Sequence, residues 1–289
     1  MSKKVLFINR FVLKIIAFVL MTFDHVGIFM VDNPNPTIST IGNILRLLGR
    51  IAFPLFVLLL VEGVRHTHSY PKYALRMGII ASVVLIAQVV IYFYFDNAVE
   101  GAYSPLLDLL CYGTILYLLN RKDKFSWLAI IPFGLVIGSY VVELIEFNTE
   151  LTIYWLPTFI RSGYSIFGLI MALIMYYSYP LLKKFFMSYH MDNEGYEDSV
   201  TFRFYLNVCY SFAVLFAVAV IYLIGQIPNC DIYGVFREWY SETWALASIL
   251  IIMFYSGLRG YKSKVLQYAS YLYFPLHLVI IYLIFYLIG

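Results

Sequence analysis

The sequence predicts an all-α fold, a polytopic transmembrane helical bundle of about nine spans that forms a single domain over residues 1–289. Hydrophobic residues make up 62% of the chain and charged residues only 13%, whereas a typical soluble domain carries about 25% charged residues. Basic residues also recur in every second loop between the apolar segments. The net charge is only +3 and the basic residues lie in short clusters, so we expect a membrane protein and not a partner of nucleic acid.

Nine apolar segments approach the roughly 20 residues that a helix needs to cross the hydrocarbon core. The fourth segment is short, and Pro157 interrupts a further apolar stretch at 150–160, so both are left open as crossing, re-entrant or interfacial. The N-terminal residues MSKKVLFINR precede a long apolar run with no small-residue cleavage site, which predicts a retained first span and not a signal peptide. The nine segments cover residues 11–31, 44–64, 73–95, 105–119, 126–146, 163–182, 204–224, 243–258 and 267–288.

The loop charges predict the orientation of the chain. Lysine and arginine precede the first segment and follow each even-numbered one, whereas the loops between them, such as 96–100 and 146–150, are neutral or acidic. Because basic loops stay on the cytoplasmic side, we expect a multi-pass cell-membrane protein with its N-terminus in the cytoplasm and its C-terminus outside. The basic clusters contain Lys3, Lys4, Arg10, Arg65, Lys72, Arg76, Arg121, Lys122, Lys124, Lys183, Lys184, Arg203, Arg259, Lys262 and Lys264.

The first segment carries three ionisable side chains in an apolar run. Lys14 and His25 are eleven residues apart, which places them within about 20° of one helical face and about 16 Å apart along the axis. An imidazole can act as a general base near neutral pH, so we predict a functional role for His25. Asp24 cannot share that face and is expected to orient a residue of a neighbouring helix. The alternative is a snorkelling Lys14 and an Asp24–His25 pair that caps the outer end of the span.

The second segment contains two arginines and a proline. Arg46 and Arg50 are four residues apart and lie on one helical face toward the outer side. We predict that Arg50 pairs with Asp24, because two buried charges are least costly when they neutralise each other. Pro54 lacks a backbone donor and is predicted to kink the helix.

Glu62 lies near the cytoplasmic end of the same segment. It is three residues from Arg65 and four from His66, so a local salt bridge is one interpretation.

The last segment places His277 near the middle of the membrane, shortly after Pro275. A lone histidine in an apolar face is often a hydrogen-bonded core residue. Because His25 lies in a different segment, a polar cavity shared by the two histidines is the functional alternative.

Motifs of soluble enzymes are absent from the sequence. It contains no G-x-S-x-G, H-E-x-x-H, Walker or G-x-G-x-x-G pattern. Cys111, Cys209 and Cys230 are too far apart in the chain for a zinc motif or a disulfide framework, and we expect no metal site.

Three segments resemble the TraX family, which is named for the F-pilin acetylation protein. They read LKIIAFVLMTFDHVG at 13–27, LRLLGRIAFPLFVLLLVEGVRHT at 45–67 and YLYFPLHLVIIYLI at 271–284, and the basic stretch GLRGYKSK at 257–264 is also similar. The resemblance is strong at both ends of the chain and weaker from about residue 73 to 198. The family belongs to a wider group of transmembrane acyltransferases whose first span carries a basic residue, ten intervening residues and a histidine, and Lys14 and His25 fit this spacing.

This resemblance implies transfer of an acyl group, usually acetyl from acetyl-CoA, to an amine or hydroxyl acceptor at or across the membrane. It implies that His25 is the general base or a transient acyl carrier, that a carboxylate such as Asp24 or Glu62 fixes its tautomer, and that His277 assists. CoA is a cytosolic polyanion, so basic side chains of the cytoplasmic side are its expected ligands. The cofactor-binding candidates are Lys14, Arg65, Lys262 and Lys264, and the supporting residues are Arg46, Arg50 and Glu62.

The expected partners are acyl-CoA, membrane lipid and an unidentified amine- or hydroxyl-bearing acceptor, with a second copy of the chain as an open alternative. A proton-coupled transporter or flippase that uses the same intramembrane charges is the main alternative. A non-catalytic membrane scaffold is the third interpretation.

Overall fold

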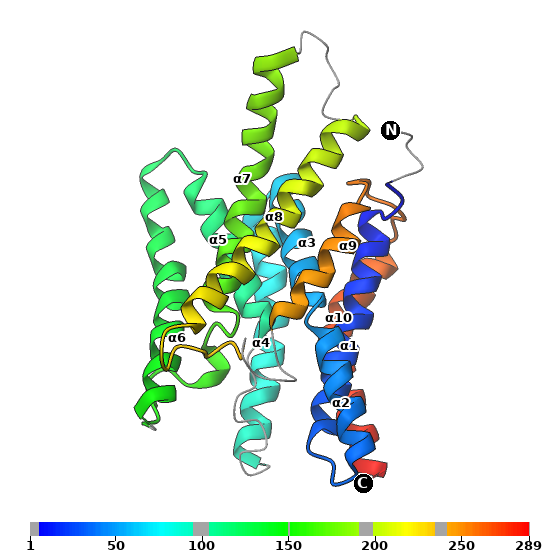
Figure 1. The fold of residues 1–289 in the computed structure, drawn as a ribbon, viewed down its shortest axis with the longest axis vertical. Helices are drawn as coiled ribbons and strands as arrows, with labels where there is room; N and C mark the ends of the chain where they lie inside the picture. The colour runs from blue at the N-terminus through cyan, green and yellow to red at the C-terminus, as the bar shows by residue number, and fades with distance from the viewer. Residues whose placement is uncertain (1–5, 95–103, 150, 191–198, 235–241, 289) are drawn as a thin grey trace. The chain divides into compact units, whose positions relative to one another are not determined.

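The computed structural model describes residues 6–94, 104–149, 151–190, 199–234 and 242–288. Within these ranges the chain forms helices and turns, together with one isolated parallel β-bridge between Ile8 and Tyr255, so the predicted all-α class is confirmed (Figure 1). The α-helices are α1 (Arg10–Val31), α2 (Pro36–Gly49), α3 (Ala52–His66), α4 (Tyr70–Tyr94), α5 (Pro105–Leu119), α6 (Ile130–Thr149), α7 (Ser165–His190), α8 (Val200–Gly225), α9 (Ser248–Met253) and α10 (Lys264–Ile288). Short 3-10 helices are η2 (Lys124–Ala129), η3 (Thr158–Ile160) and η5 (Glu242–Ala247).

Seven helical segments of the described residues are long and apolar enough to cross a membrane. Two further apolar helices, Pro105–Leu119 and Glu242–Met253, match the fourth and eighth predicted segments but have fewer than 18 residues. The polytopic bundle is therefore supported, whereas a count of exactly nine spans is not confirmed. The seven segments are Arg10–Val31, Pro36–His66, Tyr70–Ala87, Lys124–Thr149, Thr158–Ser188, Val200–Gly225 and Tyr268–Leu287.

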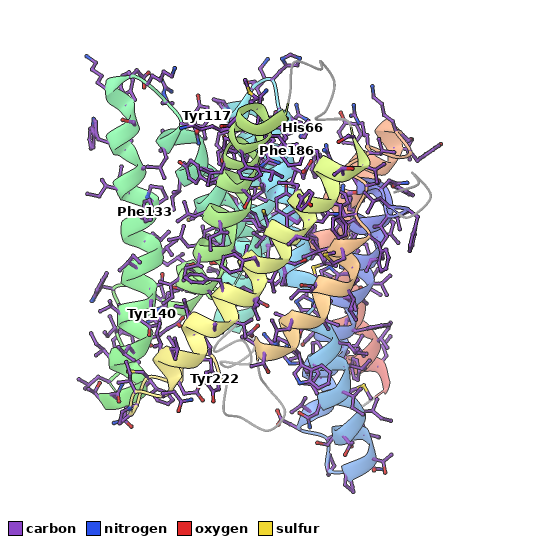
Figure 2. All side chains as sticks on the ribbon, turned by 45° about the horizontal axis from the view of Figure 1, so that its top comes forward. His66, Tyr117, Phe133, Tyr140, Phe186 and Tyr222 are labelled. Atoms are coloured by element: carbon purple, nitrogen blue, oxygen red, sulfur yellow. The ribbon has the colours of Figure 1, made fainter. Side chains whose placement is uncertain are left out.

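Large apolar side chains on the outer faces of the helices fit a membrane environment. On α1, for example, Ile15, Val19 and Phe23 are exposed at a spacing of four residues, which places them along one face. Exposed apolar rows of this kind are rare on water-soluble monomers and are compatible with lipid. On α6, which carries the rings of Phe133 and Tyr140 labelled in Figure 2, Ile130, Ile137 and Val141 are likewise exposed.

The chain divides into two compact units, and the interpretation of the whole chain as a single domain stays a prediction. Unit 1 comprises residues 1–62, 170–223 and 233–263, which include α1, α2, most of α3, α7 and α8, and all of α9. Unit 2 comprises residues 63–169, 224–232 and 264–289, which include α4, α5, α6 and α10.

In unit 1 the helices pack through aromatic rings and polar anchors. Phe18 of α1 contacts Phe56 of α3 at 5.9 Å between ring centroids, and Phe202 of α8 makes an edge contact with Phe186 of α7. The side-chain amide of Asn207 on α8 donates a 2.7 Å hydrogen bond to the carbonyl oxygen of Tyr255. Tyr255 lies just after α9 and forms the β-bridge with Ile8.

In unit 2 the buried residues Ala81 of α4 and Leu106 of α5 belong to one apolar cluster, and Phe274 of α10 packs against it. The start of α7 is attached by polar contacts: Tyr112 of α5 donates 2.8 Å to the carbonyl oxygen of Ser165. These contacts give unit 2 its own core.

The second segment is interrupted as Pro54 predicts, but by a turn between two helices and not by a kink at Pro54 itself. Helix α2 ends at Gly49, Arg50 and Ile51 form a turn, and Pro54 is the third residue of α3. The carbonyl oxygen of Arg50 is the group that a donor at position 54 would have bonded, so the missing proline N–H explains the place of the break. As a result, Arg50 stands at the end of α2.

Candidate functional site

Helix α1 carries Lys14, Asp24 and His25 as parts of one continuous element. Asn9 caps its N-terminus by accepting a 3.0 Å hydrogen bond from a backbone N–H of the first turn. The uninterrupted helix keeps Lys14 and His25 on the same face. Asp24 and His25 lie inside a helix that continues to Val31, which contradicts the alternative that they cap the outer end of the span.

The imidazole of His25 is fixed by the backbone of its own helix. Its Nδ1 lies 2.9 Å from the carbonyl oxygen of Met21, one turn earlier. A carbonyl has no proton to donate, so this hydrogen bond requires a proton on Nδ1 and leaves the lone pair of the neutral ring on Nε2. The Met21 carbonyl thus sets the tautomer, a role that the sequence assigned to a carboxylate.

Asp24 belongs to a cluster of four charged side chains in unit 1, here called the Asp24 cluster. Its Oδ2 accepts a 2.8 Å hydrogen bond from Arg46 Nη1, and its Oδ1 lies 3.8 Å from Arg50 Nη2. Arg50 Nη1 in turn donates 2.7 Å to Glu242 Oε1. The predicted Arg50–Asp24 pair is present, although Arg46 makes the closer contact. Two carboxylates and two guanidinium groups leave this cluster formally neutral.

Glycines allow α2 to approach α1 closely enough to form the Asp24 cluster. A Cβ at Gly27 of α1 would lie 2.7 Å from the carbonyl oxygen of Gly42, and a Cβ at Gly49 would collide with Asp24. Small residues let helix backbones pack closely in membranes. This packing brings the guanidinium of Arg46 onto the carboxylate of Asp24.

Glu62 forms a second cluster in unit 1, here called the Glu62 cluster, with Arg10, Arg203 and Tyr210. Its side chain is fully buried. Oε2 accepts 2.9 Å from Arg10 Nη2, and Oε1 accepts 3.2 Å from Arg203 Nη1 and 3.1 Å from Tyr210 Oη. These partners come from α1 and α8, so Glu62 is compensated over long range, and a local salt bridge with Arg65 does not account for its environment.

Comparison with protein families adds an independent result to this geometry. The family model described as TraX protein matches residues 9–285, nearly the whole chain. The chain belongs to the TraX family. The match extends through residues 73–198, where the resemblance seen in the sequence was weaker, and both charged clusters fall within it. Searches of curated proteins and of solved structures gave no match.

In this TraX family member, the basic side chains predicted to bind acetyl-CoA are divided between the two units. Lys14 is half-buried, with its Nζ 5.7 Å from the ring centroid of Phe18, and Lys262 is exposed in unit 1. Arg65 is half-buried at the end of α3 and belongs to unit 2. Lys264 begins α10, but its side chain lies outside the described residues.

His277 lies on α10 in unit 2 and is buried. Its Nδ1 is 2.8 Å from the carbonyl oxygen of Tyr273, so it has the same tautomer as His25 by the same argument, and its ring stacks on Tyr273. A cavity shared by His25 and His277 stays a prediction.

Two buried carboxylates were not singled out from the sequence. Glu242 lies just outside the predicted segment 243–258, and its pairing with Arg50 across 192 positions leaves no local pattern. Asp108 is fully buried in α5 of unit 2, where it accepts hydrogen bonds from the hydroxyl of Ser162 and the backbone N–H of Tyr164. Asp108 could have been found from the sequence, because it is a charged residue within the apolar segment 105–119.

Proposed function

We propose that this TraX family member is a membrane-embedded acyltransferase that moves an acetyl group from cytosolic acetyl-CoA to an amine or hydroxyl acceptor at or across the membrane. The observation that carries the proposal is His25. It lies inside a membrane-length helix, its Nδ1 is committed to the Met21 carbonyl, and it is adjacent in sequence to the Asp24 cluster. An imidazole with its lone pair on Nε2 is suited to act as a general base.

In the proposed reaction, Nε2 of His25 removes the proton of the acceptor amine or hydroxyl as that group attacks the thioester carbonyl. A carbon–nitrogen or carbon–oxygen bond forms, the carbon–sulfur bond breaks, and the imidazolium returns the proton to the departing CoA thiolate. A variant of this scheme makes His25 a transient acyl carrier. Both schemes need the same neutral ring.

The Asp24 cluster has an electrostatic role in this scheme. Its two arginines already compensate Asp24 and Glu242, so the cluster adds no formal net charge beside His25. A cluster without net charge neither attracts nor repels the positive charge that the imidazole gains when it takes the proton. We propose Arg46 and Arg50 as positioning residues for Asp24, and His277 as an assisting group.

The orientation proposed from the loop charges places the acyl donor on the cytoplasmic side. CoA carries several phosphate charges, and Lys14, Arg65, Lys262 and Lys264 are proposed to face it. The protein is then a multi-pass protein of the cell membrane with a cytoplasmic N-terminus.

The test is acetyl transfer by the purified full-length chain in lipid nanodiscs. Radiolabelled acetyl-CoA is supplied with a membrane extract as the source of acceptor, and wild type is compared with His25→Ala and His25→Gln. General-base catalysis contributes roughly 10²–10⁴-fold, so both variants should lose at least about 100-fold in rate. The matched control is His68→Ala, which removes an exposed imidazole between α3 and α4 and should keep the wild-type rate.

Equal transfer by wild type and both His25 variants would remove His25 from the mechanism. A proton-coupled transporter gives a different result: proteoliposomes would accumulate a solute in response to a pH gradient, without any need for acetyl-CoA. That outcome would replace the acyltransferase proposal.

A further inference from the structure

The Glu62 cluster carries more positive than negative charge. Two guanidinium groups face one carboxylate, which gives a formal charge of +1 within the cluster. The side chain of Glu62 is fully buried, whereas those of Arg10 and Arg203 retain 24% and 16% of their exposure. The negative charge is thus the inner group and the two positive groups are the accessible ones. Excess positive charge at the edge of a membrane segment is costly unless water or an anion compensates it.

A glycine-containing loop at residues 256–262 is attached to this cluster. The backbone N–H of Arg10 donates 2.8 Å to the carbonyl oxygen of Leu258. Gly257 has φ +72° and packs directly on the guanidinium of Arg203, while Gly260 has φ +71° and packs on the side chain that caps α1. Both positions need glycine, because a side chain would have neither the space nor a favourable backbone conformation.

The loop adds two exposed cations to the two partly buried ones. Arg259 lies between Gly257, which packs on Arg203, and Gly260, which packs on Asn9, and Lys262 follows two positions after Gly260. The guanidinium of Arg203 also lies over the ring of Tyr255, 5.5 Å from its centroid, which holds the group in a defined place. The starts of α1 and α8 thus supply two guanidinium groups held on one carboxylate, and the loop that packs on Arg203 supplies two exposed cations.

We propose that Arg10, Arg203, Arg259 and Lys262 form the phosphate-binding site of the CoA donor. Arginine forks and lysine ammonium groups are the usual protein ligands of phosphate. This inference rests on the proposed acyl transfer, and it adds three residues, Arg10, Arg203 and Arg259, that the sequence marks only as loop cations. It also makes Glu62 the residue that positions both guanidinium groups.

The position of the cluster relative to His25 agrees with the shape of CoA. Arg10 lies at the start of α1 and His25 lies fifteen residues later, about 22 Å along the helix axis. Lys14 and His25 share a helical face between these points. CoA holds its thioester at the end of a long flexible arm, so its phosphates and its reacting carbonyl occupy separate places.

The experiment measures equilibrium binding of radiolabelled CoA to the full-length chain in nanodiscs of phosphatidylcholine. The main variant is Arg259→Gln/Lys262→Gln, whose side chains are exposed and should not affect folding. We expect its dissociation constant to rise about tenfold, and the salt dependence of binding to weaken. The matched control is Lys122→Gln/Lys124→Gln, which removes two exposed lysines near η2 and should stay within about twofold of wild type.

A second variant tests the inner half of the site. Arg203→Lys keeps the charge near Glu62 but loses the planar fork, and we expect it to weaken CoA binding about threefold or more. A parallel titration with vesicles that contain phosphatidylglycerol tests whether the phosphate is that of a lipid headgroup.

The outcomes separate this inference from the proposed function. If wild type binds CoA and the loop variant is no weaker than the lysine control, the phosphate site is elsewhere, while acyl transfer stands. If the loop variant loses phosphatidylglycerol binding but keeps CoA binding, the site belongs to lipid and the inference is overturned. If wild type does not bind CoA at all, the proposed function fails as well.

Discussion

Glu62 in unit 1 and Asp108 in unit 2 are both fully buried carboxylates, yet the chain satisfies them in different ways. Glu62 receives two guanidinium groups and a phenol hydroxyl. Asp108 receives the hydroxyl of Ser162, a backbone N–H at 3.3 Å from Tyr164 and a longer contact of 3.5 Å from the hydroxyl of Tyr112. These donors of Asp108 are all neutral, whereas Glu62 depends on charged donors.

The difference separates a structural carboxylate from one suited to a function. The donors of Asp108 directly precede α7 or lie on α5 itself, so its hydrogen bonds fix the start of α7 at Ser165, where φ is +35°. Because these donors are neutral, they fix the start of α7 without adding a further charged group. Glu62 instead holds two cations in place, which is costly in a membrane and is consistent with the anion site proposed above.

The largest loss of stability is expected for Glu62→Gln. The substitution leaves Arg10 and Arg203 close together without a negative charge, and removal of one partner from a buried ion pair costs about 3–5 kcal/mol. We expect a loss of this size in the free energy of unfolding, measured on the full-length chain in detergent by equilibrium denaturation.

A double variant tells whether charge is the cause. Glu62→Gln/Arg203→Gln removes one cation together with the carboxylate, so it should be less damaging than the sum of its two single variants. Strict additivity would mean that the cluster acts through packing and not through charge.

Much of the fold could be predicted from the sequence, because the membrane imposes length and apolarity on each span separately. Segment 204–224, for instance, matches α8 (Val200–Gly225) closely. The short segments at 105–119 and 243–258 could not be settled this way. Both form helices, but a helix of fewer than 18 residues satisfies the apolar pattern without the length that a crossing requires.

The candidate site was predicted only in part, because many of its contacts join residues that are far apart in the sequence. Lys14, Asp24 and His25 share one helix, so their spacing is readable from the sequence. The partners of Arg50 and Glu62 lie on helices far along the chain, and a helical period says nothing about which helices become neighbours. Pro54 gave a partial signal, since it predicted a break but the turn formed at the carbonyl that lost its donor.

A smaller effect is expected at Asp108. In Asp108→Asn the amide keeps one acceptor for the hydroxyl of Ser162 but places an NH₂ against the backbone N–H of Tyr164, so about 1–2 kcal/mol of stability should be lost. Asp108→Leu leaves both donors unsatisfied and should cost roughly twice as much. Equilibrium denaturation of the two variants checks this order, and a loss from Asp108→Asn as large as that from Glu62→Gln would show that Asp108 also needs a charged partner.

The smallest effect is expected at Asp123, an exposed carboxylate paired with Arg121 between α5 and η2. The hydrogen bond from Arg121 lowers the pKa of Asp123 below its ordinary value. A lowered carboxyl pKa makes its full contribution to stability at pH values above the ordinary pKa, and that contribution is lost as the pH falls from the ordinary pKa through the lowered one. Because water and salt screen an exposed pair, Asp123→Asn should leave the unfolding midpoint unchanged at pH 7 in 0.15 M salt. A lower unfolding midpoint of Asp123→Asn at pH 7 that persists in high salt would contradict this expectation. An exposed ion pair would then stabilise the fold as the buried carboxylates do.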